Sequence, residues 1–97
     1  MTDDAVPVDE LTVEERIADA HDVAVDALRR VVEAMRAAEG ELQAEEEARR
    51  AAGSRAELRA LRSARMALVD ARKALTPALD RAEARRRAFE RQHFEPE

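Results

Sequence analysis

The chain has 97 residues and no Cys, so it holds at most one small domain and has neither disulfides nor a Cys/His zinc cluster. Charged residues make up 40% of it, and it contains only two Gly and three Pro, a composition typical of long helices rather than of sheets. Because a small scaffold without a covalent or metal staple needs another source of stability, we expect the chain to form a homo-oligomer.

Residues 1–11 are acidic and include Pro7, and we expect them to form a mobile N-terminal arm. Thr12 and Glu15 have the spacing of a capping box, in which each side chain bonds the backbone amide of the other residue. This spacing predicts the start of a helix. The apolar residues that follow recur at heptad spacing, as in a coiled-coil seam. They are Ile17, Ala24, Leu28, Val31, Met35, Ala38 and Leu42.

Gly40 lies inside this helix, where it costs about 1 kcal/mol relative to Ala. Since the heptad phase continues to Leu42, we predict that the helix runs through Gly40 without a break. The acidic run Glu45-Glu46-Glu47 comes next. We interpret it as a solvent-exposed face of the helix.

The turn Ala52-Gly53-Ser54 combines the end of one helix with the start of another. Gly53 suits the left-handed backbone position that follows many helices, and Arg49 adds positive charge to the last turn, where the helix dipole favours it. Ser54 and Glu57 have the spacing of a second capping box. The sequence therefore predicts a tight turn at residues 52–54 between two antiparallel helices.

The second helix carries an apolar residue every seven positions, at Leu61, Leu68, Leu75, Ala82 and Phe89. We place beside this row a companion row of Ala64, Ala71 and Ala78, flanked by Leu58 and Leu79. Pro77 removes one backbone hydrogen bond, and because the heptad phase passes through it unshifted we predict a kink there. The expected fold is all-α: a coiled-coil-like, antiparallel two-helix hairpin over residues 12–93, followed by a short tail over 94–97.

The two halves of the chain differ in charge. Residues 1–53 hold fifteen Asp and Glu against six Arg, a net charge of −9, whereas residues 54–97 hold seven against eleven Lys and Arg, a net of +4. We expect the two helices to attract each other. With the turn centred on Gly53, facing residues should have numbers that add to about 107, which places Leu42 near Arg65 and Ile17 near Phe89.

Some apolar residues lie outside the seam chosen above. Val25 and Val32 stand one heptad apart on the first helix, and Met66 and Val69 lie on the second. The resulting apolar band over residues 17–38 is wider than one partner helix covers. We therefore interpret these four residues as interaction residues through which hairpins assemble into a helical bundle.

Two further groups are candidate interaction sites. Arg85, Arg86 and Arg87 form a basic patch, and Phe94 is an aromatic residue on an acidic tail. Phosphate binding needs a basic patch, but the chain is acidic as a whole and lacks the aromatic platform of single-strand binders. We therefore expect the arginines to face the acidic helix at Asp19, Asp22 and Asp26, and we do not expect nucleic acid as a partner.

Catalytic and metal chemistry find little support. Glu90 and His93 have the Glu-x-x-His spacing of di-iron bundles, but the motif occurs once and near a helix end. His21 lies in the row of Leu28 and Met35, and we expect it to be half-buried near Arg86. With no Cys, no Tyr, one Lys and no phosphate-binding loop, we expect no enzyme activity, no cofactor and no metal site.

The sequence favours a non-enzymatic protein–protein interaction module, a structural or adaptor component of a larger assembly that binds itself and another protein. The alternative is a small acidic regulator or inhibitor that binds one partner through its negative helix. Only Lys73 among the seventeen basic residues is Lys, an arginine bias that we interpret as the mark of a GC-rich genome, such as that of an actinobacterium or its phage. With no signal peptide or membrane span in sight, we expect a cytoplasmic protein or one packed inside a virion or particle, without a membrane partner.

Overall fold

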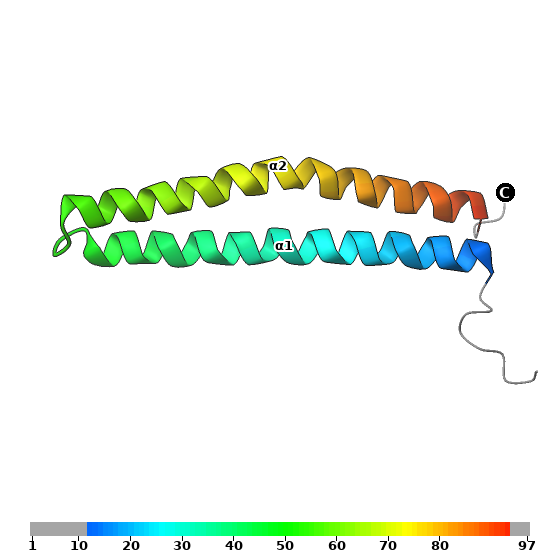
Figure 1. The fold of residues 1–97 in the computed structure, drawn as a ribbon, viewed down its shortest axis with the longest axis horizontal. Coiled ribbons are helices and arrows are strands. Elements are labelled where there is room, and N and C mark those ends of the chain that lie inside the picture. Colours follow the sequence, from blue (N-terminus) through cyan, green and yellow to red (C-terminus); the bar gives the residue numbers. More distant parts are fainter. Residues whose placement is uncertain (1–11, 94–97) are drawn as a thin grey trace, which may run out of the picture.

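The computed structural model describes residues 12–93. Two helices, α1 (Val13–Arg49) and α2 (Arg55–His93), lie side by side and antiparallel (Figure 1). The predicted all-α hairpin is confirmed. The predicted arm over residues 1–11, the tail over 94–97 and the candidate site Phe94 lie outside the described residues.

Both predicted capping boxes are present. The Thr12 amide donates to Glu15 Oε1 at 2.9 Å and the Glu15 amide donates to Thr12 Oγ1 at 3.1 Å. At the start of α2 the Ser54 amide donates to Glu57 Oε1 at 3.2 Å, and the Glu57 amide donates to Ser54 Oγ at 3.1 Å. Each box satisfies backbone amides that the first turn of a helix leaves without a partner, and so fixes where each helix begins.

Gly53 serves the turn in a way that differs from the prediction. Its backbone does not take the left-handed conformation, so that prediction is wrong. Instead its amide donates to the Arg49 carbonyl oxygen at 2.6 Å. A Cβ at this position would lie 2.8 Å from that oxygen and 2.9 Å from Arg49 Cβ. Glycine is needed here because two stretches of chain approach closely, not because φ is positive.

Neither Gly40 nor Pro77 ends a helix. α1 continues through Gly40, whose missing Cβ would meet open space, and α2 continues through Pro77. Directly before the proline, the Thr76 hydroxyl donates at 2.9 Å to the carbonyl oxygen of Arg72, one turn earlier. The continuity of α1 confirms the prediction for Gly40, while the kink at Pro77 stays a prediction.

The interface between the helices uses one of the two rows expected in each. On α1 the row of Leu28, Met35 and Leu42 is half-buried, as predicted. Its companion row was wrongly assigned: Val25 is 0% exposed and Val32 4%, whereas Ile17 is 42% exposed and Val31 44%. The prediction that Val25 and Val32 lie off the seam is therefore wrong, since they are the buried apolar core.

The same correction holds for α2. The row from Leu61 to Phe89 is half-buried, as predicted. Its partner is not the alanine row but a row with the same seven-residue repeat that lies one position along, whose Arg65 and Arg72 pair with carboxylates of α1. That row consists of Leu58, Arg65, Arg72, Leu79 and Arg86, all half-buried. Three of its five members are arginines, so a search for repeated apolar residues does not detect this row.

Contacts across the hairpin fix its register. Glu46 pairs with Arg65, Glu39 with Arg72, and His21 lies against Phe89, so the residue numbers of these three seam contacts add to 110 or 111. The other ion pairs between the helices give sums from 106 to 112, around the predicted 107. The placements of Leu42 near Arg65 and Ile17 near Phe89 stay predictions. The sums of 110 and 111 at the seam are higher than 107 because helical side chains lean toward the N-terminus of their own helix. In an antiparallel pair this lean brings together residues of higher combined number than those whose backbones face each other.

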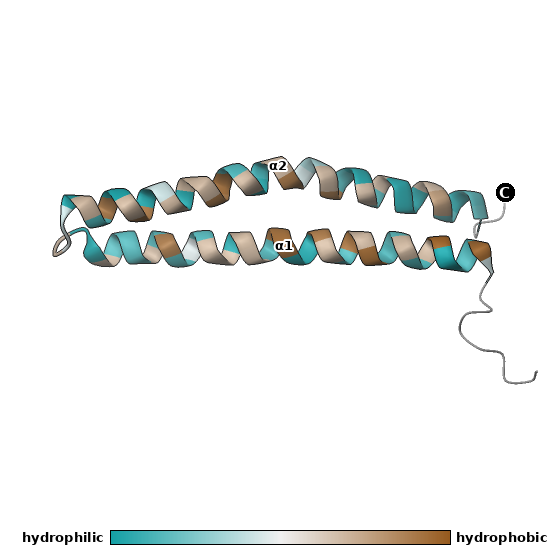
Figure 2. Ribbon diagram, in the orientation of Figure 1, coloured by the Kyte–Doolittle hydropathy of each residue, from teal (hydrophilic) through white to brown (hydrophobic). Residues whose placement is uncertain are grey.

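Hydropathy is uneven along the hairpin. Figure 2 shows hydrophobic positions gathered in the part of α1 far from the turn, while the C-terminal third of α2 is mostly hydrophilic. The smallest extent of the molecule is 15 Å, close to the ~10–12 Å diameter of a single helix. The hairpin is therefore one helical layer thick, and each of its two broad faces meets solvent.

Candidate protein-interaction surface

Ion pairs, not only apolar contacts, join the two helices in the half nearest the turn. Arg72 Nε donates to Glu39 Oε2 at 2.6 Å and its Nη2 donates to Oε1 at 3.2 Å. Arg65 binds Glu46 in the same bidentate way: its Nε donates to Oε2, and its Nη2 donates to Oε1 at 3.3 Å. These hydrogen bonds favour the ionised carboxylate and lower the pKa of both Glu39 and Glu46. The geometry is the bidentate one that gives arginine–carboxylate pairs directional specificity.

Glu46 is the clearest departure from the sequence interpretation. Its side chain is only 6% exposed in its pair with Arg65, so the prediction that Glu45, Glu46 and Glu47 form one solvent-exposed face is wrong for the middle residue. Glu39 and Glu46 continue the seven-residue row of Val25 and Val32. That continuation, together with arginines at the same spacing on α2, is the signal in the sequence that could have identified these pairs.

One broad face of the hairpin is also ion-paired. Arg29 Nη2 lies 2.6 Å from Glu83 Oε2, and Arg86 Nη1 lies 3.6 Å from Asp22 Oδ1. Arg29 and Asp22 flank the buried row on the same side of α1, one heptad apart. We call the side of the hairpin that carries Arg29 and Glu83 the charged face.

The opposite flank of α1 carries a second apolar seam. Counting from Val13, its residues follow one another by four and three positions in strict alternation, which is the spacing of one helix face. No charged residue interrupts this run. It consists of Val13, Ile17, Ala20, Ala24, Ala27, Val31, Ala34 and Ala38, and all but Ala38 are exposed.

α2 carries a matching run with the same alternation. It consists of Ala60, Ala64, Ala67, Ala71, Ala74 and Ala78, of which only Ala71 and Ala78 are half-buried. Together the two runs form what we call the outer seam. Because Arg29 and Glu83 lie on the other flanks of their helices and pair with each other, both outer-seam runs must share the face opposite the charged face.

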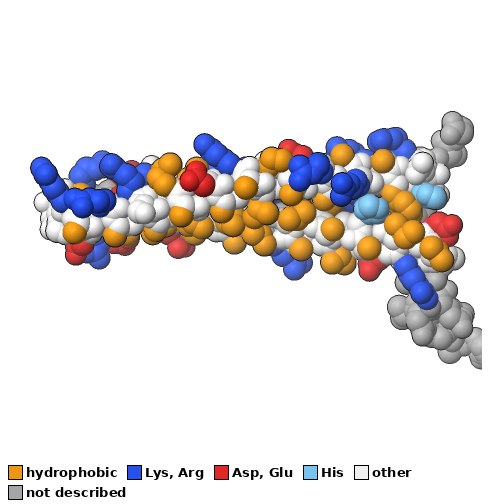
Figure 3. Space-filling model, turned by 45° about the horizontal axis from the view of Figure 1, so that its top comes forward, with side chains coloured by type: hydrophobic (Ala, Val, Ile, Leu, Met, Phe, Trp, Pro, Cys, Tyr) orange, Lys and Arg blue, Asp and Glu red, His pale blue; other side chains and the backbone are white. Residues whose placement is uncertain are grey.

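A space-filling view supports an apolar face that spans both helices. In Figure 3 hydrophobic side chains gather over the middle of the visible face and toward the open end, while basic side chains lie at the turn end and among the hydrophobic ones along α2. Ile17 and Val31 are among the largest exposed apolar side chains of the hairpin. We take this face as the candidate interaction surface, because contiguous exposed apolar surface is where soluble proteins commonly bind partners.

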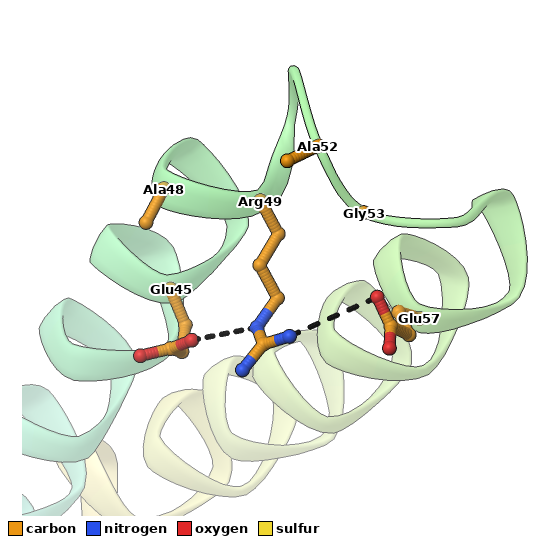
Figure 4. Close-up of a pocket in the computed structure, with 6 residues that line it drawn as sticks. All are labelled: Glu45, Ala48, Arg49, Ala52, Gly53 and Glu57. Carbon is orange, nitrogen blue, oxygen red and sulfur yellow. Dashed lines mark hydrogen bonds and ion pairs between the residues drawn. The ribbon is translucent and has the colours of Figure 1, made fainter.

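A shallow hollow lies at the turn, and the charged side chains that line it pair with one another. Arg49 Nε donates to Glu45 Oε1 at 2.8 Å, and Arg49 Nη1 lies 3.8 Å from Glu57 Oε1 (Figure 4). Ala48, Ala52 and Gly53 complete the lining. The guanidinium bridges the last turn of α1 and the first turn of α2. The hollow therefore reads as part of the turn's own structure and not as a ligand pocket.

The remaining predicted interaction residues are scattered. Met66 is 44% exposed and Val69 half-buried. Arg86 pairs with Asp22, as the expected contact with the acidic helix requires, while Arg85 and Arg87 are exposed. Among residues 12–93, the structure thus does not bring the predicted interaction residues together into one site.

The open end of the hairpin carries a small aromatic cluster. Phe89 lies between His21, at 5.4 Å between ring centroids, and His93, at 4.3 Å. His21 is half-buried, as predicted. Within residues 12–93, no group of three or more His, Cys, Asp or Glu side chains could hold a metal ion.

Comparisons with protein-family models, with curated proteins and with solved structures found no match to this chain. In the part of the chain that the structure describes, neither helix is long and apolar enough to cross a membrane.

Proposed function

We propose that this protein is a non-enzymatic protein–protein interaction module that acts as a structural or adaptor component of a larger assembly. The observation that carries the proposal is the outer seam, an uninterrupted apolar run on α1 beside an alanine run on α2. Each helix thus has two apolar seams, and the hairpin itself buries one of them. A helix with two such seams is built to contact neighbours on both.

The small core of the hairpin supports the same proposal. Among the described residues only Val25 and Val32 are buried apolar side chains. Stable domains pack at least two layers of secondary structure around a core, whereas this hairpin is a single layer. Covering the outer seam would supply the missing layer, so oligomerisation is part of the proposed function. The proposed kink at Pro77 would let α2 follow the curvature of such a bundle.

The acidic regulator is the weaker alternative. Such a protein would leave the acidic side chains over residues 39–47 to its partner. Glu39 and Glu46 instead engage Arg72 and Arg65 within the hairpin, and Glu45 pairs with Arg49. These contacts favour the assembly component over the regulator.

The molar mass of the purified chain in solution tests the proposal. Sedimentation equilibrium at tens of micromolar should give at least twice the 10.9 kDa of one chain, with helical circular dichroism. The same chain, immobilised, should retain a further protein from lysate of its host as a component of the assembly. A folded, monodisperse species of 10.9 kDa that retains no protein would contradict the proposed function.

A further inference from the structure

We propose that the outer seam is covered by a second copy of this chain, packed face to face with both turns at the same end, so that α1 of each copy lies over α2 of the other. This inference rests on the proposed function and specifies its partner and arrangement. The product is a four-helix bundle in which every helix is antiparallel to its neighbours.

The outer seam limits how two copies can meet. A two-fold symmetric contact uses the same surface on both subunits, so the two outer-seam faces must stack on each other. Two arrangements satisfy this condition. With the axis along the helices, the turns lie at the same end and α1 covers α2 of the partner. With the axis across the helices, the turns lie at opposite ends and each helix covers its own counterpart.

Charge distinguishes these arrangements. α1 holds eleven acidic residues against five Arg, a net of −6, and α2 holds five acidic against eleven basic residues, a net of +6. Stacking each helix on its counterpart would set −6 beside −6 and +6 beside +6. Stacking α1 on α2 of the partner surrounds every acidic helix with basic ones, and like-charge juxtaposition is what excludes wrong registers in helical bundles.

The charges of α1 and α2 are also opposite within each end of the hairpin. This local match matters because salt screens interactions between charges that lie far apart. At the open end, residues 14–23 of α1 carry a net −3 and residues 84–93 of α2 a net +3. Near the turn, residues 44–49 carry −2 and residues 55–63 carry +2. These stretches lie at matching distances from the turn, so they meet across the dimer only when both turns are at the same end.

The opposite charges of α1 and α2 also explain why a second copy of this chain, and not another protein, covers the outer seam. The surface to be covered has one acidic and one basic helix, with small apolar residues over 13–38 of the first and 60–78 of the second. The same flanks continue with Glu41 and Glu45 on α1 and with Arg81 and Arg85 on α2, so the complement needs the same two helices in exchanged positions. The hairpin itself meets that description. Alanines along α2 also permit the close approach of a neighbouring helix.

The chain contains no Cys, so a single spin label reports the arrangement directly. Ala51 lies exposed in the turn, away from the outer seam. In the full-length Ala51→Cys variant, labelled with a nitroxide, we expect a dipolar distance of about 20–35 Å between the turns of one dimer. Opposite turns would be separated by the length of α1, about 55 Å at ~1.5 Å per residue.

Ala37→Cys serves as the matched control because Ala37 is exposed near the middle of α1 and outside the outer seam. Its label gives a measurable distance in either dimer. A distance at Ala37 together with one of about 55 Å or more at Ala51 would overturn the proposed arrangement and leave the interaction module intact. A 10.9 kDa species with no dipolar coupling at either site would overturn the second copy as occupant, and retention of another protein would then decide the proposed function separately.

Discussion

Val25 and Val31 lie six positions apart on the same helix, yet Val25 is fully buried against α2 and Val31 is 44% exposed. Both belong to apolar rows with a seven-residue repeat, so apolar periodicity does not tell which row faces α2. Charge decides it: the row of Val25 continues into Glu39 and Glu46, which meet arginines of α2. The sequence therefore predicts the existence of a seam but not its identity unless charged residues are counted among its members.

Replacing Val25 tests the assignment of the core. Val25→Ala should lower the free energy of unfolding by about 2 kcal/mol, because two buried methyl groups are lost and a cavity remains. Val23→Ala is the matched control, since Val23 is 59% exposed and should change stability by less than about 0.5 kcal/mol. Both variants gain the same helix propensity, so the difference between their free energies of unfolding in urea reports the effect of burial alone. Equal losses would show that Val25 is not in the core.

The two glycines should respond in opposite directions to alanine. Gly40→Ala should raise the free energy of unfolding by about 0.5–1 kcal/mol, since a Cβ there meets open space inside a helix. Gly53→Ala should lower the melting temperature, because its Cβ would lie 2.8 Å from the Arg49 carbonyl oxygen. Thermal unfolding followed by circular dichroism compares the two. A stabilised Gly53→Ala variant would be inconsistent with this turn.

At the scale of the helices, local signals in the sequence were sufficient for the boundaries but not for the contacts. The two capping boxes place the starts of α1 and α2, and the opposite charges of the halves agree with their pairing. The individual partners depend on how side chains lean along an antiparallel pair. A sum rule based on backbone position therefore missed Glu46 with Arg65 and Glu39 with Arg72.

The ion pairs predict how stability depends on pH. Hydrogen bonds from Arg72 and Arg65 hold the pKa of Glu39 and of Glu46 below the ordinary value of 4.5. A carboxylate whose pKa is lower in the folded state stabilises that state fully above the unfolded pKa and loses this contribution as pH falls through the folded pKa. The urea midpoint should therefore be flat near neutral pH and fall below about pH 4.5.

The double variant Glu39→Gln, Glu46→Gln isolates this contribution. It should be less stable than wild type at pH 7 and should lose less on acidification. Glu41→Gln, Glu47→Gln is the matched control, because both residues are exposed on the same stretch of α1. If both double variants behave alike at every pH, the seam ion pairs do not stabilise the hairpin.

At the scale of the whole molecule, the hairpin could be predicted from the sequence, whereas the surface that we propose to meet a further helical layer could not. The predicted interaction residues Val25 and Val32 turned out to be the core. The exposed surface is formed by residues first assigned to the core, Ile17 and Val31 among them. The two seams were exchanged because both have heptad spacing, and only contacts between α1 and α2 separate them.

A charge placed in the outer seam should break the proposed assembly. Val31→Asp should increase the dissociation constant at least ten-fold, because the carboxylate would be buried against an apolar partner surface. Val23→Asp introduces the same charge at an exposed valine of α1 outside both seams and should leave the dissociation constant within about two-fold. Sedimentation equilibrium measures both, and equal effects would remove the outer seam as the contact surface.

The concentration dependence of thermal unfolding tests the central claim, that the hairpin is one layer of an assembly held by its outer seam. When folding is coupled to association, the melting temperature rises with chain concentration by mass action. Circular dichroism melts of the wild-type chain between about 2 and 200 µM should show a clear rise, and those of Val31→Asp should show little. A wild-type melting temperature that is the same over this hundred-fold range would contradict the claim, because the hairpin would then be stable alone.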